Sequence, residues 1–416
     1  MLPPNLPDDD KVAAIRELLP ATAAGIYLNT GSAGPLPAET VAAMREQEDR
    51  ELAAGRGHPD SFEDAKERMA EARGALAALL STDLDAVALT HSTTDGMNAA
   101  VASLPWSPGD RVVTTRHEHP GGLGPLLALR DRLGVTIDFL DLGNGDDDAR
   151  TMAALVSALE LRPRAVVLSH VLWTTGAVMP IARIGAAARD AGAVTIVDAA
   201  QSVGAISVHP DELRIDTVAF AGQKWLLGPE GMGGLWASTA AQERLPVAAG
   251  WFAFERFSMD GDVAWQPNAR RFEWSNFHRP SVTGLARSLG WLAMSVGLPW
   301  AFERAGRMAQ AAHDRLASIP GVRVVTPRHA MATLVSFRID GWPAEAAYQE
   351  LTARTFAIIR TVPGVDALRI SVGFWTTAEE LDRFAEGVEL LARHTPDTVP
   401  PRRRLAVLGA DGRPID

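Results

Sequence analysis

Short apolar runs alternate with longer amphipathic segments through the first half of the chain. Each run has the length of a buried strand, and the segments between the runs repeat apolar positions at helical spacing. Strands that alternate with helices predict a mostly parallel sheet with helices on both faces. The predicted strands are Ala86–Thr90, Arg111–Thr115, Val135–Leu140, Ala165–Ser169, Ala193–Val197 and Thr217–Phe220, and the predicted helices between them are Gly122–Leu133, Met152–Leu159 and Ile181–Ala191.

The segments that flank this region predict further helices and a second unit. Leu36–Leu52 and Phe62–Leu80 repeat apolar positions as helices do, and a long helical stretch follows Gly284 and reaches about Ser318. Strands are then predicted at Val322–Val325, Ala332–Ile339 and Ala367–Val372. We therefore expect a large α/β domain over residues 26–284 and a smaller α+β domain over residues 1–25 and 285–399. Residues 400–416 form a tail, predicted as a linker and a short hairpin.

The chain contains three lysines, and one of them follows a predicted buried strand. Lys224 lies after the apolar run Val218–Phe220 and before a glycine-rich turn, whereas Lys11 and Lys66 lie in polar segments and are predicted to be solvated. An amine at the end of a buried strand loses its proton readily or forms an imine. Such a lysine suits a pyridoxal-phosphate enzyme. The plainer alternative is a surface lysine after a strand.

An aspartate stands in the matching place upstream. Asp198 ends the apolar run Ala193–Val197, and ligands of open α/β sheets bind beyond the carboxyl ends of the strands. A buried carboxylate needs a cation or several donors, and a protonated pyridine nitrogen would supply the cation. A helix cap is the alternative for this aspartate.

A threonine-rich junction offers a place for a phosphate. The predicted strand Ala86–Thr90 is followed by His91-Ser92-Thr93-Thr94-Asp95-Gly96, which opens a helix through Met97–Leu104. Backbone N–H groups and hydroxyls at a helix N-terminus bind anions. The same run is also an ordinary N-cap.

Taken together, these segments resemble the class V, fold-type I pyridoxal-phosphate enzymes, over about Tyr27 to Leu391. That family includes cysteine desulfurases, selenocysteine lyases, cystine carbon–sulfur lyases and isopenicillin N epimerase-like proteins. The resemblance implies an α/β fold with a mostly parallel, seven-stranded sheet flanked by helices, a smaller α+β domain and pyridoxal 5'-phosphate as cofactor. The pattern is most similar to that of the cystine carbon–sulfur lyases.

The resemblance also implies roles for individual residues. Lys224 would carry the cofactor as a Schiff base, Asp198 would pair with the pyridine nitrogen and Gln201 would approach the ring hydroxyl. Thr93 and Thr94 match the phosphate-binding region. In Arg116-His117-Glu118-His119-Pro120, His119 rather than His117 would stack on the ring and assist catalysis. A surface loop or a metal site is the alternative for this histidine pair, but no third ligand with suitable spacing is present, so no metal is predicted.

Several positions depart from the family pattern. Ala221 replaces a serine or threonine, Gln223 replaces a histidine before the lysine, and His170 replaces an asparagine that faces the cofactor. In this family a homodimer partner supplies a phosphate contact from a segment like Arg271–Asn276. Here Asn276 stands where threonine is common.

Two arginines indicate an amino-acid substrate. Arg369 lies in an expected strand that precedes a capping box, Thr377-Ala378-Glu379-Glu380, and a bidentate guanidinium suits an α-carboxylate. The resemblance to cystine lyases adds Arg360 to this carboxylate site, although a surface charge is the alternative. It also places Trp251 on the substrate side.

The chain has no cysteine, so it cannot form the protein-bound persulfide of a desulfurase, nor a disulfide. We therefore expect carbon–sulfur β-elimination from a cysteine-derived L-amino acid such as cystine or a cysteine conjugate. A class V aminotransferase or an epimerase like isopenicillin N epimerase is the alternative within the fold. A non-catalytic cofactor-binding protein is the alternative outside enzymes.

Charge and hydropathy limit the other partners. The formal net charge of −11 disfavours binding to nucleic acid. The apolar runs are too short to span a membrane, and the N-terminus lacks the pattern of a signal peptide. We therefore expect a cytoplasmic protein that binds neither nucleic acid nor membrane.

Overall fold

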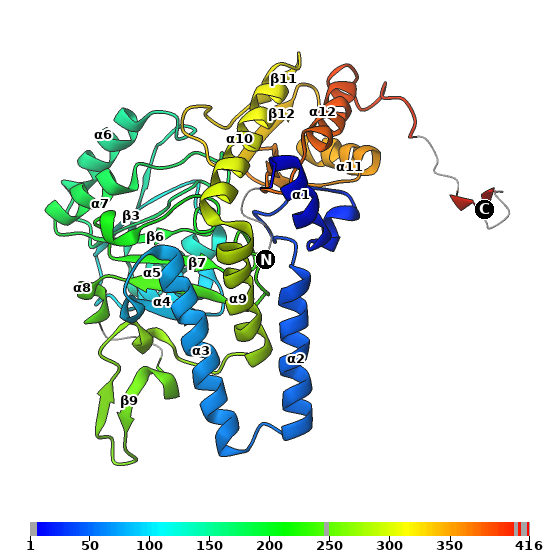
Figure 1. Cartoon of the computed structure of the whole chain (residues 1–416). Coiled ribbons are helices and arrows are strands. Elements are labelled where there is room, and N and C mark those ends of the chain that lie inside the picture. Colours follow the sequence, from blue (N-terminus) through cyan, green and yellow to red (C-terminus); the bar gives the residue numbers. More distant parts are fainter. Residues whose placement is uncertain (1–5, 245–248, 403–406, 409–413, 416) are drawn as a thin grey trace.

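The fold comes from a computed structural model, which describes residues 6–244, 249–402, 407–408 and 414–415. Figure 1 shows a sheet wrapped by helices, a second group of helices and strands above it, and two long helices, α2 and α3, along one side. The model therefore has the α/β architecture that the alternating pattern predicts.

Seven strands form the large sheet in the order β2-β8-β7-β6-β5-β3-β4. All six predicted strands of this region are confirmed with shifts of one residue or none at their ends. They are β2 (Val87–Thr90), β3 (Arg111–Thr115), β4 (Thr136–Leu140), β5 (Ala165–Ser169), β6 (Val194–Asp198) and β7 (Thr217–Ala221). The pairs from β4 through β7 are parallel. The sequence analysis missed β8 (Gly233–Ala237), which pairs antiparallel with both β2 and β7, because two glycines open it.

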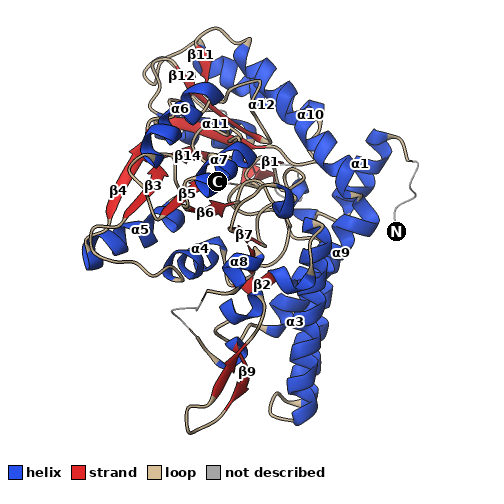
Figure 2. Ribbon diagram, turned by 90° about the vertical axis from the view of Figure 1, so that its left-hand side faces the viewer, coloured by secondary structure: helices blue, strands red, loops and turns tan. Residues whose placement is uncertain are grey.

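Helices cover both faces of this sheet, as Figure 2 shows. One face buries residues of α3 and α7 against the strands, and the other buries α4 and α5. The strands are apolar on both sides, as expected for a parallel sheet covered twice. The helices around this sheet, on its two faces taken together, are α3 (Pro59–Leu80), α4 (Thr93–Ala102), α5 (Pro120–Leu133), α6 (Asp148–Leu159), α7 (Ile181–Asp190) and α8 (Thr239–Gln242).

The long helical stretch predicted after Gly284 is two helices. α9 (Arg279–Trp291) begins before that glycine and packs against α2 (Ala38–Ala54) and α3. A five-residue π-helix follows, and the chain turns at Gly297, whose φ is +83°. α10 (Leu298–Ala317) then packs against β11, β12 and α12. The apolar spacing continues through the break, and only the glycine marks the turn.

The second sheet has four antiparallel strands in the order β11-β12-β15-β14. They are β11 (Val322–Val324), β12 (Leu334–Ile339), β14 (Arg360–Val362) and β15 (Ala367–Ser371). α11 (Ala344–Thr355) and α12 (Ala378–Ala392) cover the sheet, and the predicted capping box at Thr377 and Glu380 is present at the start of α12. We keep the division at residues 284 and 285 as a proposal.

The N-terminal segment packs beside the second sheet and its helices. β1 (Ile26–Tyr27) pairs with β13 (Ala357–Ile358), and α1 (Asp8–Glu17) packs near α10 and α12. Lys11 of α1 is buried with its ammonium 4.1 Å from the centroid of the Trp300 ring, so its prediction as a solvated charge is wrong. Lys66 is exposed, as expected.

Two short strands, β16 (Val407–Leu408) and β17 (Pro414–Ile415), pair antiparallel in the tail. The turn of the predicted hairpin lies outside the described residues. Within the described ranges, none of the helices combines the length and apolar character that a membrane crossing requires. Two more strands, β9 (Phe254–Phe257) and β10 (Val263–Trp265), form a hairpin that projects from the body beside α3 (Figure 1).

Candidate active site

Asp198 and Lys224 lie at the same edge of the large sheet. Asp198 is the last residue of β6, and Lys224 follows the end of the neighbouring parallel strand β7. The carboxyl ends of parallel strands meet at one edge, where ligands of such sheets bind. The chain path thus brings the two predicted catalytic residues together.

Burial and mutual charge set the ionisation of this pair. Burial lowers the pKa of Lys224 to about 8, and Asp198 opposes that change. Burial raises the pKa of Asp198, which the charge of Lys224 and a 2.9 Å hydrogen bond from the Ala200 N–H counteract. A cation that faced Asp198 would favour its ionised form.

His119 stands above this edge as the N-cap of α5. Its Nδ1 accepts a hydrogen bond from the Gly121 N–H at 3.1 Å, and its partly exposed ring meets Trp173 edge to face at 5.3 Å. The buried part of the ring and the nearby cations of Lys224, Arg360 and Arg369 lower the pKa of His119 to about 4. The imidazole is therefore neutral at neutral pH.

His117 is engaged elsewhere. Its Nε2 lies 2.8 Å from the Gly143 carbonyl and its Nδ1 lies 2.6 Å from Thr174 Oγ1, and burial lowers its pKa. Both ring nitrogens thus have partners inside the protein. This geometry supports the choice of His119 over His117.

The N-termini of α4 and α5 lie side by side. A Cβ added at Gly121, in the first turn of α5, would lie 2.2 Å from Thr94 Oγ1. Thr93 Oγ1 is buried, and the described chain gives it no hydrogen-bond partner; the same is true of Gln223 Oε1. Ser92 caps α4 by accepting the Asp95 N–H. Two adjacent helix N-termini with spare hydroxyls suit an anion.

His170 and Gln201 follow β5 and β6 at this edge. Burial lowers the pKa of His170 to about 4, and its Nδ1 is enclosed without a partner among the described residues. Gln201 donates from Nε2 to the Gly31 carbonyl at 2.8 Å and accepts the Trp225 indole N–H at 3.0 Å. The protein thus orients Gln201 fully, whereas His170 keeps one unused nitrogen.

Arg369 and Arg360 stand opposite each other on the antiparallel strands β15 and β14. Burial lowers the pKa of Arg369 to about 9, and Arg360 adds to this effect. Arg369 donates from Nη1 to the Trp173 carbonyl at 2.9 Å, but its Nε and Nη2 have no partner in the described part of the chain. Two adjacent guanidinium groups repel each other unless an anion lies between or beside them.

Gly31 connects the arginines to the rest of the site. A Cβ at this position would lie 2.8 Å from both Gln201 Oε1 and Ser371 Oγ and 3.0 Å from Arg369 Nη2. Only glycine fits without moving these groups. The sequence analysis did not single out Gly31, because its constraint comes from residues far away in the chain.

Within one chain, the fold does not bring Trp251 and Asn276 to the residues around Lys224. The Trp251 side chain is 65% exposed and lies near Phe257. Asn276 is exposed, and its carbonyl lies 3.3 Å from His91 Nε2. Across the described residues, no hydrogen bond links either residue to Lys224.

Glu118 is a buried acid that the sequence analysis quoted without a role. Its two carboxyl oxygens each lie 2.6 Å from a hydroxyl, one of Thr115 and one of Ser169. Burial raises the pKa of Glu118 to about 7, and the nearby charge of Asp198 adds to the rise. The sequence feature that could have identified Glu118 is a charged residue between two histidines, just after the end of a predicted strand.

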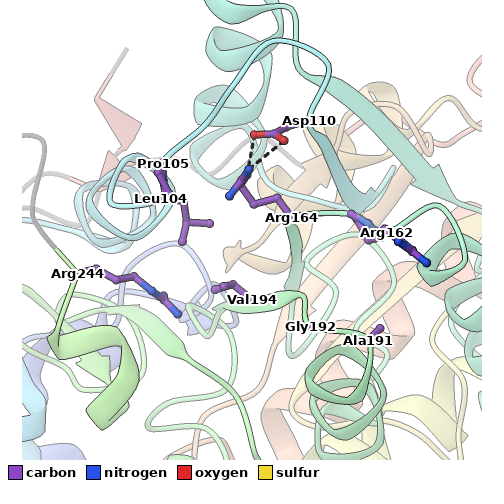
Figure 3. A pocket seen from close by; sticks show the side chains of 10 residues that line it. Leu104, Pro105, Asp110, Arg162, Arg164, Ala191, Gly192, Val194 and Arg244 are labelled. Atoms are coloured by element: carbon purple, nitrogen blue, oxygen red, sulfur yellow. Dashed lines mark hydrogen bonds and ion pairs between the residues drawn. The ribbon is translucent and has the colours of Figure 1, made fainter.

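The opposite edge of the sheet carries a cavity of about 610 Å³ at the amino ends of β5 and β6. Figure 3 shows Arg164 turned toward Asp110, which it binds with two hydrogen bonds. Arg244 in turn pairs with Asp216. These arginines are neutralised by carboxylates, and the cavity contains none of the predicted site residues.

The residues at the carboxyl edge fit pyridoxal phosphate. A buried carboxylate at Asp198 matches a protonated ring nitrogen, and Lys224 supplies an amine with a lowered pKa. The unpartnered Thr93 hydroxyl and the adjoining helix N-termini match a phosphate. His170 Nδ1 remains for a further polar group of the ligand.

Comparisons with known proteins agree with this geometry. The family model described as "Aminotransferase class-V" matches residues 26–384. A probable cysteine desulfurase from Methanothermobacter thermautotrophicus is 27% identical over 91% of this chain and 97% of its own length. An isopenicillin N epimerase from Streptomyces clavuligerus is 30% identical over 88% of this chain and 94% of its own.

Two solved structures of one protein share the fold. The complex of the cystine C–S lyase C-DES with its product cysteine persulfide superposes with a TM-score of 0.84 at 27% identity, over 89% of this chain and 99% of the other. A lysine-to-alanine variant of C-DES, with glycine covalently linked to the PLP cofactor, gives 0.85 at 27% identity over 90% and 98%. The chain belongs to the class-V aminotransferase family and is a pyridoxal-phosphate-dependent enzyme of fold type I.

Proposed function

We propose that the protein is a carbon–sulfur lyase that carries out β-elimination on a cysteine-derived L-amino acid, such as cystine or a cysteine conjugate. The observation that carries this proposal is the Lys224–Asp198 pair beside the facing arginines Arg360 and Arg369, in a chain without cysteine. The similarity to C-DES supports the choice of cystine as the first substrate to test.

In this proposal the two ends of the site hold different anions. Arg369, with Arg360 opposite it, binds the α-carboxylate of the amino acid through a planar, charge-assisted fork. Thr93 and Thr94 bind the cofactor phosphate at the N-terminus of α4, next to that of α5. Gln223 would donate to the phosphate from its amide nitrogen. Asp198 would pair with the protonated ring nitrogen of the cofactor, and that positive charge would favour the ionised carboxylate.

Lys224 and His119 handle protons. When bound, pyridoxal phosphate supplies an electron sink for the negative charge that forms at Cα. Lys224, with its pKa lowered to about 8, has a neutral form at neutral pH that removes the α-proton. His119 is neutral and next to Lys224, so it can hold or relay a proton. His170 and Gln201 orient the ligand from the neighbouring strand ends.

The absence of cysteine decides how sulfur leaves. No thiol in these 416 residues can accept sulfur from the substrate. The sulfur therefore leaves bound to its original fragment. For L-cystine that fragment is cysteine persulfide, and pyruvate and ammonia form in equal amounts.

We propose that the enzyme acts as a homodimer. Trp251 is 65% exposed and Met259, in the same region, is 94% exposed. A partner subunit would bury these side chains and bring its Trp251 and Asn276 to the site. Sedimentation velocity measures this directly, and a monomer at micromolar concentration contradicts it.

A panel of L-amino acids tests the reaction. The purified enzyme, loaded with cofactor, is mixed with L-cystine, S-methyl-L-cysteine or L-alanine without any 2-oxo acid. We expect ammonia and pyruvate from a sulfur-substituted substrate and neither from L-alanine. Formation of L-alanine from added L-cysteine, with its sulfur atom transferred to an added thiol as a persulfide, would instead indicate desulfurase-like chemistry.

The 30% identity to an isopenicillin N epimerase favours a second candidate, amino-acid epimerisation. An epimerase exchanges the α-proton with solvent and releases no ammonia. An aminotransferase, the third outcome, turns over only when a 2-oxo acid is added. Deuterium incorporation at Cα without ammonia would therefore replace the lyase proposal with the epimerase.

A further inference from the structure

The loop that follows β5 carries a tryptophan, Trp173, whose ring contacts two residues of the site and whose carbonyl contacts a third. The Trp173 ring meets His119 edge to face, with centroids 5.3 Å apart. The guanidinium carbon of Arg360 lies 5.5 Å from the centroid of the same ring. The Trp173 carbonyl accepts the hydrogen bond from Arg369 Nη1 at 2.9 Å. One residue thus touches both arginines and the histidine.

This loop is attached to the four-stranded sheet. Two carbonyls accept hydrogen bonds from this sheet: Trp173 from Arg369 at 2.9 Å and Thr174 from the Ser336 hydroxyl at 2.7 Å. The next carbonyl, that of Thr175, accepts from the hydroxyl of Thr326, in the segment between β11 and β12, at 2.5 Å. The next residue, Gly176, has a φ of +77° and leaves no room for a Cβ, which would lie 2.7 Å from the Leu334 carbonyl. The position of Trp173 is therefore fixed by the sheet that carries the arginines.

The two arginines need such a support before any carboxylate binds. Arg360 and Arg369 are directly opposite in the register of β14 and β15, so their charges repel. An aromatic face attracts one guanidinium and a carbonyl accepts from the other, so the same residue offsets part of this repulsion from both sides. If the side chains of a site are already in position before the ligand binds, binding costs less free energy for ordering them.

We propose that Trp173 is the positioning residue that holds Arg360 and Arg369 in place for a substrate carboxylate, through its ring face and its carbonyl respectively. This inference rests on the proposed carboxylate site at the two arginines. Trp173 lies outside the motifs that the chain shares with the family, and the proposed role depends on the aromatic face of its ring and not on the indole N–H. Trp173 Nε1 is buried and has no hydrogen-bond partner in the described ranges, so a phenyl ring in its place loses no hydrogen bond within the chain.

Binding of a carboxylate that cannot react tests the proposal. The probe is 3-(methylthio)propanoate, which has a carboxylate and a thioether but no amino group, titrated into the cofactor-loaded enzyme by calorimetry. In the Trp173→Leu variant we expect binding about tenfold weaker, the factor that ~1.4 kcal/mol gives. Trp173→Phe keeps an aromatic face and should bind within about threefold of the wild type. The visible spectrum of the bound cofactor should match the wild type in both variants.

A matched control is Trp300→Leu, which removes an indole with Lys11 4.1 Å from its ring centroid, outside the site. It should bind the probe as the wild type does. Wild-type affinity in Trp173→Leu, or equal losses in the Phe and Leu variants, overturns the proposal. If the Leu variant does not fold, a cycle of Trp173→Met, which also removes the aromatic face, with Arg360→Met replaces it. Coupled losses support the positioning role and additive losses overturn it.

The failure of this inference is distinguishable from the failure of the proposed function. Arg369→Lys is titrated with the same probe. If Arg369→Lys binds like the wild type, the proposed carboxylate site itself is wrong. If Arg369→Lys weakens binding and the Trp173 variants do not, only the role of Trp173 is refuted.

Discussion

Replacing Glu118 with glutamine should change how the stability of the protein depends on pH. Glu118 is buried, its carboxyl oxygens face two hydroxyls, and Asp198 is nearby. Glu118→Gln keeps the size of the side chain and its hydrogen-bonding capacity but removes the titration. The hydroxyls of Thr115 and Ser169 can rotate to face the amide.

The magnitude follows from the pKa. Burial raises the pKa of Glu118 from 4.5 to about 7. Between these values the unfolded chain releases the proton and the folded chain retains it, so the wild type loses stability as pH rises. The loss amounts to about 3 kcal/mol at ~1.4 kcal/mol for each pH unit. Glu118→Gln does not incur it and should gain that much relative to the wild type.

Urea unfolding of the cofactor-free proteins at a series of pH values measures the difference. Any constant cost of the amide shifts the whole curve and leaves its slope unchanged. We expect the stability of Glu118→Gln minus that of the wild type to rise by about 3 kcal/mol between pH ~4 and ~8. Glu386→Gln, an exposed site on α12, is the control and should give a flat difference. A flat difference for Glu118→Gln would refute the reasoning.

Three further predictions concern other parts of the molecule. Because the pKa of Lys224 is lowered to about 8, the cofactor-free protein should capture added cofactor faster as pH rises to about 8, and at a constant rate above it. Borohydride should then fix the cofactor on Lys224. Stopped-flow absorbance measures the capture and peptide mass spectrometry locates the fixed cofactor; capture that keeps accelerating to pH ~10 contradicts this prediction. Arg73→Met should lower the free energy of unfolding by about 3–5 kcal/mol, because it leaves the buried carboxylate of Glu273 unpaired, and the double change with Glu273→Gln should recover part of the loss. His170→Asn should leave folding intact and shift the cofactor absorption band, since the buried imidazole has an unused nitrogen at the strand end; an identical spectrum would place His170 away from the cofactor.

The periodic pattern predicted the fold well where the strands are uniformly apolar. The strands β2, β3, β5, β6 and β7 are buried almost throughout, so their apolar runs are continuous and their ends are marked by polar residues. The edge strand β4 is only partly buried, but its sequence still contains three apolar residues. β8 begins with Gly233 and Gly234, which have no apolar side chain to contribute to a pattern. The break at Gly297 was missed for a related reason, since helical spacing continues on both sides of it.

Site residues could be predicted from the sequence where the chemistry requires one residue type. They were harder to predict where contacts with residues distant in the chain determine which side chain fits. Lys224 and Asp198 are recognisable because each ends a strand with a charge. Gly31 and Trp173 act through contacts with β15, far along the chain, and no local pattern marks them. In the described part of one chain, neither Trp251 nor Asn276 makes a hydrogen bond to Lys224, so any role of theirs at the site requires the proposed homodimer.

The turn at Gly297 and the attached loop together restrict how the two sheets can move. α9 packs on the helices beside the large sheet and α10 packs on the small one, so a hinge motion between them would pivot at Gly297. Yet the carbonyls of residues 173 and 174 bind the small sheet and that of residue 175 binds the segment after β11, although the loop itself extends from β5 of the large sheet. A rotation about the pivot must therefore carry Trp173 along with Arg369. The two arginines would then move toward or away from Lys224 together, with their positions relative to each other unchanged. Hinge bending would alter the distance from Lys224 to the substrate Cα but not the contacts between the arginines and the carboxylate.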